Sequence, residues 1–265
     1  MKQIIILTYV WYNKYFPIQR GKAFIGKCLA KILGKVLINI DGQYLEILPN
    51  SSMDLSYFGG YDNSSHKVII EEINKLKEGA VFADIGANIG YFTFVASKKI
   101  GPLGLVYAFE PSIREYQRLL SGILKNSFTN IIPFNIALGD NQGIVTFNLS
   151  SDSHTGLNSI ISKTPQSINV NVFLSKLDDI YTNNRIIDLV KLDVEGYEMA
   201  VLLGMKKLFE SKVIKKLIIE ITPHLLTSSG YSKEFLYEYL SLYGYKSSYN
   251  LQDWQYDEVF TLEEI

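Results

Sequence analysis

From residue 80 onward, short apolar runs alternate with longer amphipathic stretches. Runs rich in Val, Ile or Phe, as expected for strands buried on both faces, lie at 81–85, 104–110, 131–137, 186–193 and 214–221. Helical patterns lie between or after most of them, at 88–99, 112–126, 196–210 and 231–243. This alternation predicts an α/β fold in which helices cover both faces of a mostly parallel sheet.

One segment interrupts this alternation. Residues 140–180 are polar and rich in Ser, Thr and Asn, and we expect short strands within them at 143–149 and 168–173. We interpret the segment as an insertion into a domain covering 80–265. Its position in the chain predicts that it forms one wall of a pocket.

The first 79 residues follow another pattern and are expected to form an N-terminal extension. Apolar positions at helical spacing predict a helix over 22–34. Two short apolar runs around Asp41-Gly42 predict a hairpin over 36–48, and 63–79 reads as a helix that Gly79 ends. The extension is therefore expected to be helix, hairpin and helix.

The charge in the extension is one-sided, because every charged residue before Asp41 is basic. Lysines recur every fourth residue of the predicted helix, and an apolar face lies beside them: Lys27, Lys31 and Lys35; Phe24, Ile25, Cys28, Leu29 and Ile32. Such a helix either lies on an anionic membrane or docks on its own domain with solvated lysines. We favour docking, because the apolar face is short and Gly26 interrupts it.

Composition limits the class of protein further. The chain has 265 residues, of which 47% are hydrophobic, and a net charge of -1, so no general attraction to nucleic acid is expected. Cys28 is the one cysteine, which excludes an intramolecular disulfide and fits a reducing compartment. The apolar start is too short and too interrupted for a signal peptide, and no run is long enough to span a membrane. We expect a soluble, cytoplasmic protein without stable membrane insertion.

In a parallel sheet ligands bind beyond the carboxyl ends of the strands, and the first predicted strand ends in an unusual turn. Its sequence runs Asp84-Ile-Gly86-Ala87-Asn88-Ile-Gly90. We expect Gly86 to allow a sharp turn and Gly90 to let backbone and ligand approach closely. Asn88 stands where a dinucleotide-binding G-x-G-x-x-G needs glycine. A carboxylate ahead of the turn suits a ligand that carries positive charge.

The next two strand ends add complementary chemistry. Glu110 ends the second predicted strand twenty residues after Gly90, where an acidic residue grips a ribose diol, and Pro111 then stops the strand. The third strand ends near Ala137, a small apolar surface that suits the flat face of an adenine.

Acidic residues gather at the fourth and fifth strand ends. Asp193 and Glu195 cost electrostatic free energy at the mouth of a sheet unless something uses them, whereas Glu198 is explained by capping the next helix. The fifth strand ends in Glu220, and His224 follows. His224 is either a general base or only a loop residue. His66 is interpreted as structural.

Taken in order, Asp84-x-Gly-x-Asn-x-Gly, Phe109-Glu-Pro and Lys191-Leu-Asp-Val-Glu-Gly-Tyr-Glu resemble the FkbM family of S-adenosylmethionine-dependent methyltransferases, over about residues 59 to 222. The resemblance implies a Rossmann-like class I methyltransferase fold with seven strands, the last antiparallel. It implies O-methylation of a hydroxyl on a sugar, glycan or natural product, with the acceptor chosen by the two ends of the chain.

The resemblance also assigns roles to residues. Those implied to bind the cofactor are Asp84, Gly86, Ala87, Asn88, Gly90, Glu110, Pro111 and Ala137. Asp193 and Glu195 are implied to face the reacting methyl group, with His224 as the competing base. No metal ligand is assigned, although Mg²⁺ shared by the two acids is an alternative to proton transfer.

Two other functions compete with this one. An RNA methyltransferase is disfavoured by the neutral charge balance and by the lack of a basic, aromatic surface in the core domain. A catalytically silent module that binds a nucleoside and docks a partner is disfavoured by the intact acids at 193 and 195. The acceptor is therefore expected to be a small molecule or a glycan and not a nucleic acid.

Overall fold

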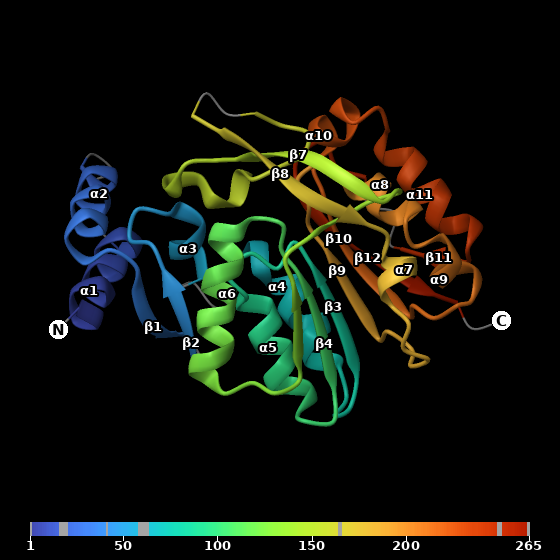
Figure 1. Cartoon of the computed structure of the whole chain (residues 1–265), viewed down its shortest axis with the longest axis horizontal. Helices are drawn as coiled ribbons and strands as arrows, with labels where there is room; N and C mark the ends of the chain where they lie inside the picture. The colour runs from blue at the N-terminus through green and yellow to red at the C-terminus, as the bar shows by residue number, and fades with distance from the viewer. Residues whose placement is uncertain are drawn as a thin grey trace.

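A central sheet of seven strands organises the computed structural model, which describes residues 2–15, 21–40, 42–57, 64–163, 166–247 and 251–263. The strands are ordered β11-β12-β10-β9-β3-β4-β5 (Figure 1). Their bounds are β3 Val81–Ile85, β4 Leu105–Phe109, β5 Ile131–Phe134, β9 Leu189–Leu192, β10 Lys216–Ile221, β11 Tyr245–Lys246 and β12 Tyr256–Leu262. β12 runs antiparallel to both neighbours, whereas the other pairs are parallel. The expected fold class is confirmed.

Both faces of the sheet are buried, because alternate residues of each strand point to opposite sides. In β3, Ala83 packs with Val81 and Ile85 in one apolar cluster, whereas Phe82 belongs to the other. The first cluster includes α7 Leu177–Ile180, α8 Glu198–Leu203, α9 Lys206–Glu210, α10 Pro223–Ser228 and α11 Lys233–Leu242. The second includes α4 Ser64–Lys75, α5 Tyr91–Ile100 and α6 Ile113–Asn126. Layers of helices therefore cover the two faces (Figure 1).

Two predicted elements are split. The strand expected over 131–137 ends at Phe134, and β6 Ala137–Leu138 instead pairs with β8 Ile168–Ser175, which also pairs with β7 Gly143–Leu149. A 3₁₀ helix, η2 Asp152–Leu157, follows β7. The helix expected over 196–210 breaks into α8 and α9 at Gly204, where a Cβ would lie 1.9 Å from the Gly139 carbonyl oxygen. A close backbone approach thus interrupts this helix.

The extension holds more helix than its pattern predicts. It consists of α1 Lys2–Tyr15, α2 Lys22–Leu33, β1 Val36–Ile40, β2 Gln43–Ile47 and α3 Ser52–Ser56, followed by α4. Ile38 and Leu45 of the hairpin pack in the same apolar cluster as Phe82 of the sheet. Asp41 of the predicted turn lies outside the described residues. The extension therefore shares a hydrophobic core with the sheet, and the proposed boundary after residue 79 stays a prediction.

The helix α2 does pack on the rest of the chain, with Leu33 against the core cluster, but the apolar face expected to make that contact is largely exposed. Phe24 is 71% and Ile32 76% exposed. The helix packs instead through Gly26, where a Cβ would lie 2.5 Å from the Tyr9 hydroxyl oxygen of α1. Gly26 is thus the contact between the two helices, and it does not interrupt the exposed face.

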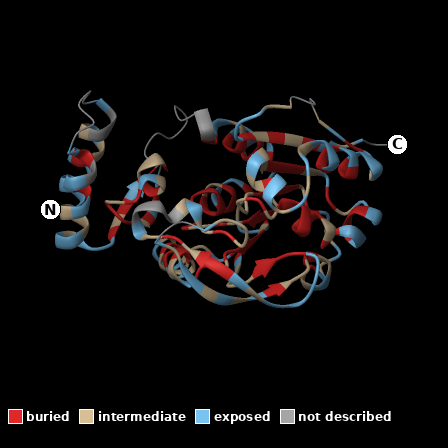
Figure 2. Cartoon of the chain, turned by 90° about the horizontal axis from the view of Figure 1, so that it is seen from above, coloured by how far each residue is buried: buried red, intermediate tan, exposed pale blue. Residues whose placement is uncertain are grey.

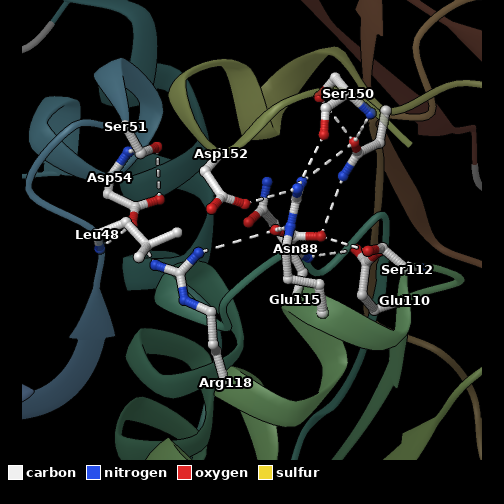
Figure 3. A network of polar contacts seen from close by, with 12 residues as sticks. Leu48, Ser51, Asp54, Asn88, Glu110, Ser112, Glu115, Arg118, Ser150 and Asp152 are labelled. Carbon is white, nitrogen blue, oxygen red and sulfur yellow. Dashed lines mark hydrogen bonds and ion pairs between the residues drawn. The ribbon is translucent and has the colours of Figure 1, made fainter. Parts of the chain in front are cut away.

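A buried ion pair joins the extension to α6 (Figure 3). Arg118 and Asp54 have fully buried side chains and are in direct contact. Arg118 Nε also donates to the Glu46 carbonyl oxygen at 2.9 Å, and Asp54 Oδ2 accepts from the Leu48 backbone N at 2.6 Å. The end of β2 and the start of α3 are thereby fixed to the helix that follows β4.

The same network continues to the polar insertion (Figure 3). The side chain of Glu115 is also fully buried, and its Oε1 lies 3.8 Å from Arg118 Nη1. The same Oε1 accepts a hydrogen bond from Arg114 Nε at 2.7 Å. Arg114 Nη1 donates to the Ser150 carbonyl oxygen at 2.8 Å and to Asp152 at 2.9 Å. One line of charged groups therefore holds the extension and the insertion on the same helix.

We predict that Arg118→Met lowers the free energy of unfolding by about 3–5 kcal/mol, because it leaves the buried Asp54 carboxylate without its counter-ion. Urea denaturation monitored by circular dichroism measures the change. Adding Asp54→Asn should recover part of the loss, since the double variant buries no unpaired charge. A single-variant loss below about 1 kcal/mol, the value of an exposed pair, would contradict the proposed importance of this contact.

Candidate functional site

A cavity of about 440 Å³ lies beyond the carboxyl ends of β3, β4 and β9. Its volume is within the range of small-molecule sites, about 300–1,000 Å³. The residues implied for the site that line it are Gly86, Asn88, Glu110, Pro111, Ala137, Asp193 and Glu195. Strands far apart in sequence thus bring most of the implied residues into one space.

The turn after β3 is held tightly against the end of β9. Gly86 has φ +81°, and a Cβ there would lie 1.9 Å from the Asp193 carbonyl oxygen. The backbone N atoms of Gly86 and Ala87 both donate to the Phe109 carbonyl oxygen, at 3.0 and 2.9 Å. A glycine is therefore required at 86 both by the left-handed backbone and by the close approach.

Asn88 and Glu110 form a linked pair on the cavity wall. The Asn88 backbone N donates to Glu110 Oε2 at 2.7 Å, and the Ser112 N donates to Oε1 at 2.8 Å. Burial, followed by the nearby charge of Glu115, raises the pKa of Glu110 to about 8. Asn88 itself has φ +50°, and its buried Oδ1 accepts no hydrogen bond from the described residues. A ligand with hydroxyl or amine donors would satisfy these oxygens.

Three residues implied to bind the cofactor lie behind the cavity wall. Asp84 is 1% exposed and accepts from the Thr93 hydroxyl at 2.6 Å, and Ala87 is buried. Gly90 has φ +93°, and its missing Cβ would clash with Leu119 at 2.6 Å. A side chain at Gly90 would therefore meet core side chains, and the expectation that its backbone lets a ligand approach stays a prediction. Asp84, Ala87 and Gly90 are not among the residues that line the cavity.

Lys191 connects these buried acids to the cavity. Its Nζ lies 3.4 Å from Asp84 and 3.2 Å from Asp193, and it donates to the Gly86 carbonyl oxygen at 3.1 Å. Burial alone would lower the pKa of Lys191, but Asp193, Asp84 and Glu220 hold it above its usual value. The lysine is therefore a permanent positive charge beneath the site.

Three carboxyl groups meet at one end of the cavity: Asp193, Glu195 and Glu220, whose oxygens lie within 4.8 Å of one another. Burial and then the charge of Asp193 raise the pKa of Glu195 to about 8, and they raise the pKa of Glu220 well above its usual value. Crowded carboxylates avoid this repulsion by keeping protons, by taking up protons from a ligand, or by holding a cation such as Mg²⁺. The cluster is thus suited to proton acceptance or to metal binding.

The backbone presents Glu195 in an uncommon conformation. Its φ is +52°, a left-handed value that non-glycine residues adopt mainly where the surroundings impose it. The Glu195 carbonyl oxygen accepts from the buried Ser159 hydroxyl of the insertion at 2.8 Å. The insertion therefore braces the loop that carries this carboxyl group.

Glu198 and the predicted candidate base His224 do not line the cavity. Glu198 is buried and accepts from the Gly196 backbone N at 2.9 Å at the start of α8, which agrees with its interpretation as a helix cap. His224 lies on α10, is exposed and does not line the cavity. Its position therefore gives no support to the role of competing base.

The wall opposite the sheet comes partly from the extension, which the motifs did not indicate. It contributes Ser52, Met53, Ser56, His66 and Ile69. The insertion contributes Phe147, Gly156, Leu157, Asn158 and Ile160, which confirms its predicted place in the wall. Both segments held by Arg118 and Glu115 thus enclose the site.

His66 was missed as a site residue. It is 6% exposed. Its ring stacks on the Tyr57 ring and packs edge to face with the Phe92 ring, with 5.3 Å between the ring centroids in both cases. Burial, followed by the charge of Lys191, lowers its pKa to about 4, so the imidazole is neutral at physiological pH. Nothing in its local sequence signals this position, because tertiary packing of α4 brings it to the cavity.

Comparison with known proteins identifies a related methyltransferase. The chain is 28% identical over 157 residues to the hexuronic acid methyltransferase AglP of Haloferax volcanii. The match covers 58% of this chain and 60% of AglP, so the chain spans about three fifths of that relative's length.

Two solved structures with low sequence identity are also similar to this chain in fold. A SAM-dependent methyltransferase from Aquifex aeolicus aligns with TM-score 0.44 and 15% identity, covering 76% of this chain and 90% of that one. TYW2 of M. jannaschii, solved in complex with AdoMet, aligns with TM-score 0.44 and 17% identity, covering 86% and 87%.

The model of the methyltransferase FkbM domain matches residues 84–247, which is well over half of the chain. The matched region begins at Asp84, and it includes the turn after β3, Glu110 and the carboxyl cluster. These residues were the ones on which the resemblance rested. The chain therefore belongs to the FkbM methyltransferase family.

Proposed function

We propose that this enzyme methylates a hydroxyl group of a sugar unit in a glycan. One observation carries the proposal: a single cavity is lined both by Glu110, which would hold a ribose, and by the carboxyl cluster of Asp193, Glu195 and Glu220. The cofactor and acceptor sites would thereby be adjacent. Bringing two reactants together in a productive geometry contributes roughly 7–11 kcal/mol to catalysis.

The residues present fit S-adenosylmethionine, which supplies a methyl group activated by a positively charged sulfur. Glu110 would accept hydrogen bonds from the ribose hydroxyls, and the unpartnered Asn88 Oδ1 would accept from a donor on the methionine part. Ala137, between Ile136 and Leu138, offers an apolar surface for adenine. The carboxyl cluster complements a cationic sulfur, whose charge favours its ionised form.

The walls suit a sugar as the acceptor. Carboxylates accept hydrogen bonds from hydroxyl groups, and further polar side chains face the same space, namely Ser52, Ser56, Asn158 and Gln255. Phe92 and Tyr197 add aromatic surface for the apolar face of a sugar ring. The relative AglP is named for a hexuronic acid, which supports a glycan acceptor.

The same carboxyl cluster argues against a polyanionic acceptor. RNA phosphates approaching Asp193 and Glu195 would be repelled, and the net charge of -1 offers no compensating attraction. We therefore propose that nucleic acid is not the acceptor. The single Cys28 is in keeping with a reducing compartment, and we propose that the enzyme works in the cytoplasm.

Within this proposal Glu195 or Asp193 removes the proton of the acceptor hydroxyl. The pKa of Glu195, about 8 through burial and the charge of Asp193, lies near physiological pH, which is where a general base works best. Glu220 would share or relay that proton, because its oxygens lie within the same 4.8 Å cluster.

We predict that Glu110→Ala lowers the affinity for S-adenosylmethionine at least roughly tenfold, since one or two hydrogen bonds to the ribose hydroxyls are lost. Isothermal titration calorimetry measures the change. Glu78→Ala, which removes an exposed glutamate outside the cavity, serves as the matched control. Equal affinity in the two variants would reject the ribose assignment.

We predict that S-adenosylmethionine binds more tightly as the pH rises from 6.5 to 8.5. Glu195, with a pKa of about 8, holds a proton at the lower pH, and a nearby sulfonium favours the carboxylate, so binding releases the proton. For one such group the gain in affinity is roughly ten- to thirtyfold. S-adenosylhomocysteine shares the other titrating groups but lacks the positive charge on sulfur, so the affinity for it should depend less strongly on pH. If a Glu195→Gln variant still bound S-adenosylmethionine with a stronger pH dependence than S-adenosylhomocysteine, by the same margin as the parent enzyme, this assignment would be contradicted.

We predict that Asp193→Asn and Glu195→Gln each lower kcat, measured at saturating S-adenosylmethionine, at least roughly 10²-fold. Transfer of labelled methyl groups to neutral glycans, uronic-acid glycans and RNA first identifies the acceptor. Glu198→Gln, a carboxyl-to-amide change just outside the cavity, should retain most activity. RNA as the one methylated acceptor would overturn the proposed function.

The same assay separates proton transfer from metal assistance. Activity that EDTA removes and Mg²⁺ restores assigns the cluster to a metal ion, whereas activity unaffected by EDTA assigns it to proton transfer. Near-normal turnover in both amide variants combined with an inactive His224→Ala or His66→Ala would transfer the role of base to that histidine.

A further inference from the structure

The first two helices expose large apolar side chains at the N-terminal end of the molecule. Ile4, Leu7 and Trp11 follow one another along one side of α1 at helical spacing, and Ile4 is 68% and Trp11 60% exposed. On α2, Phe24 and Ile32 are exposed more still. Figure 1 places α1 and α2 beyond the hairpin at one end of the long axis, and Figure 2 shows their outer surfaces as largely exposed.

The internal packing of this helical pair leaves those side chains outside. Ile6 and Tyr9, on the other side of α1, are buried, and Ile6 joins the core cluster of the hairpin. Tyr9 closes against α2 through a hydrogen bond from its hydroxyl to the Lys22 carbonyl oxygen at 2.8 Å. Both helices are thus folded onto the protein by one side, and none of the described residues buries Trp11, Phe24 or Ile32.

The charge of this region has a single sign. Seven of the chain's 26 basic residues precede Asp41, and none of its 27 acidic residues does. Lys35 pairs with Glu46 of β2 at 3.3 Å, whereas the described residues offer no acidic partner within ion-pair distance to the exposed Lys27 and Lys31. Exposed aromatic and aliphatic groups therefore stand beside uncompensated positive charge.

We propose that α1 and α2 form a surface that binds an anionic lipid bilayer from one side. The combination of Trp, Phe and Ile side chains with lysines is the one by which amphipathic helices lie in the membrane interface, and Trp favours that depth. The helices have 14 and 12 residues, short of the roughly 20 needed to cross. No helix in the described parts of the chain meets the length and hydropathy of a membrane span.

Charge distinguishes this partner from a second copy of the chain. Two copies that meet through these helices would bring Lys27 and Lys31 of each toward a surface of the same sign, which costs free energy. An anionic bilayer attracts the lysines and accepts the apolar groups at once. The lipid surface is therefore the occupant that satisfies both properties of the region, independently of which acceptor the enzyme methylates.

Vesicle binding of the 265-residue chain tests the proposal. We expect it to sediment with vesicles of 30% phosphatidylglycerol in phosphatidylcholine at 150 mM salt, and to remain in the supernatant with phosphatidylcholine alone. Lys27→Glu/Lys31→Glu and Phe24→Ser/Ile32→Ser should each weaken the binding at least roughly tenfold. The matched controls are Lys98→Glu/Lys99→Glu and Leu242→Ser, which change exposed residues of the same types elsewhere and should leave binding unchanged.

Fluorescence reports whether α1 itself contacts lipid. Trp254→Phe leaves Trp11 as the one tryptophan, whose emission should shift to the blue and be quenched by brominated lipid when anionic vesicles are added. Equal binding to neutral vesicles, equal binding by the two α2 variants and their controls, or an unshifted Trp11 would overturn the proposal. So would a stable dimer that the Phe24→Ser/Ile32→Ser variant dissolves, since the exposed surface would then be an interface between copies.

Discussion

The site depends on one buried ammonium group. Lys191 Nζ lies between Asp84 and Asp193 and holds the Gly86 carbonyl oxygen, so it ties the carboxyl end of β9 to the turn after β3. It is outnumbered by the acids around it, and this imbalance leaves Glu195 and Glu220 with raised pKa values because burial and neighbouring carboxylates disfavour their charge. Lys191 thus fixes the position of the β9 end relative to the turn after β3, while the carboxyl groups that outnumber it favour a positively charged ligand in the cavity.

That imbalance also matches the charge change of the proposed reaction. A bound sulfonium would favour ionised Glu195 and Glu220. On methylation of the acceptor hydroxyl, these carboxyl groups would take up its proton. They would thereby exchange one positive neighbour for one proton, and the electrostatic balance beside Lys191 would be kept. A cavity with fewer acids would bind the cation less well, and one with more lysines would repel it.

The strand-end chemistry was predictable because it follows from topology. Parallel strands align their carboxyl ends. Glu110, Asp193 and Glu195 each end or follow such a strand, so they lie close together although they are far apart in the sequence. The pattern gave no means of telling which side of a turn faces the cavity. Gly90 turns toward Leu119 and its neighbours in the core, and only the packed structure determines that. His66 likewise reaches the site through the packing of α4, which no local motif encodes.

The extension shows the same limit for surfaces. Periodicity correctly predicted that α2 has an apolar face, but it could not say what covers that face, and the structure leaves Phe24 and Ile32 exposed. The inner side of the extension is fixed by the buried contact between Arg118 and Asp54, which holds the wall of the cavity in place. Because that contact anchors α3 to α6 independently of α1 and α2, the outer helices need not contribute to the site. Their exposed apolar surface, which a monomer keeps at a risk of aggregation, is better explained by a partner outside the chain.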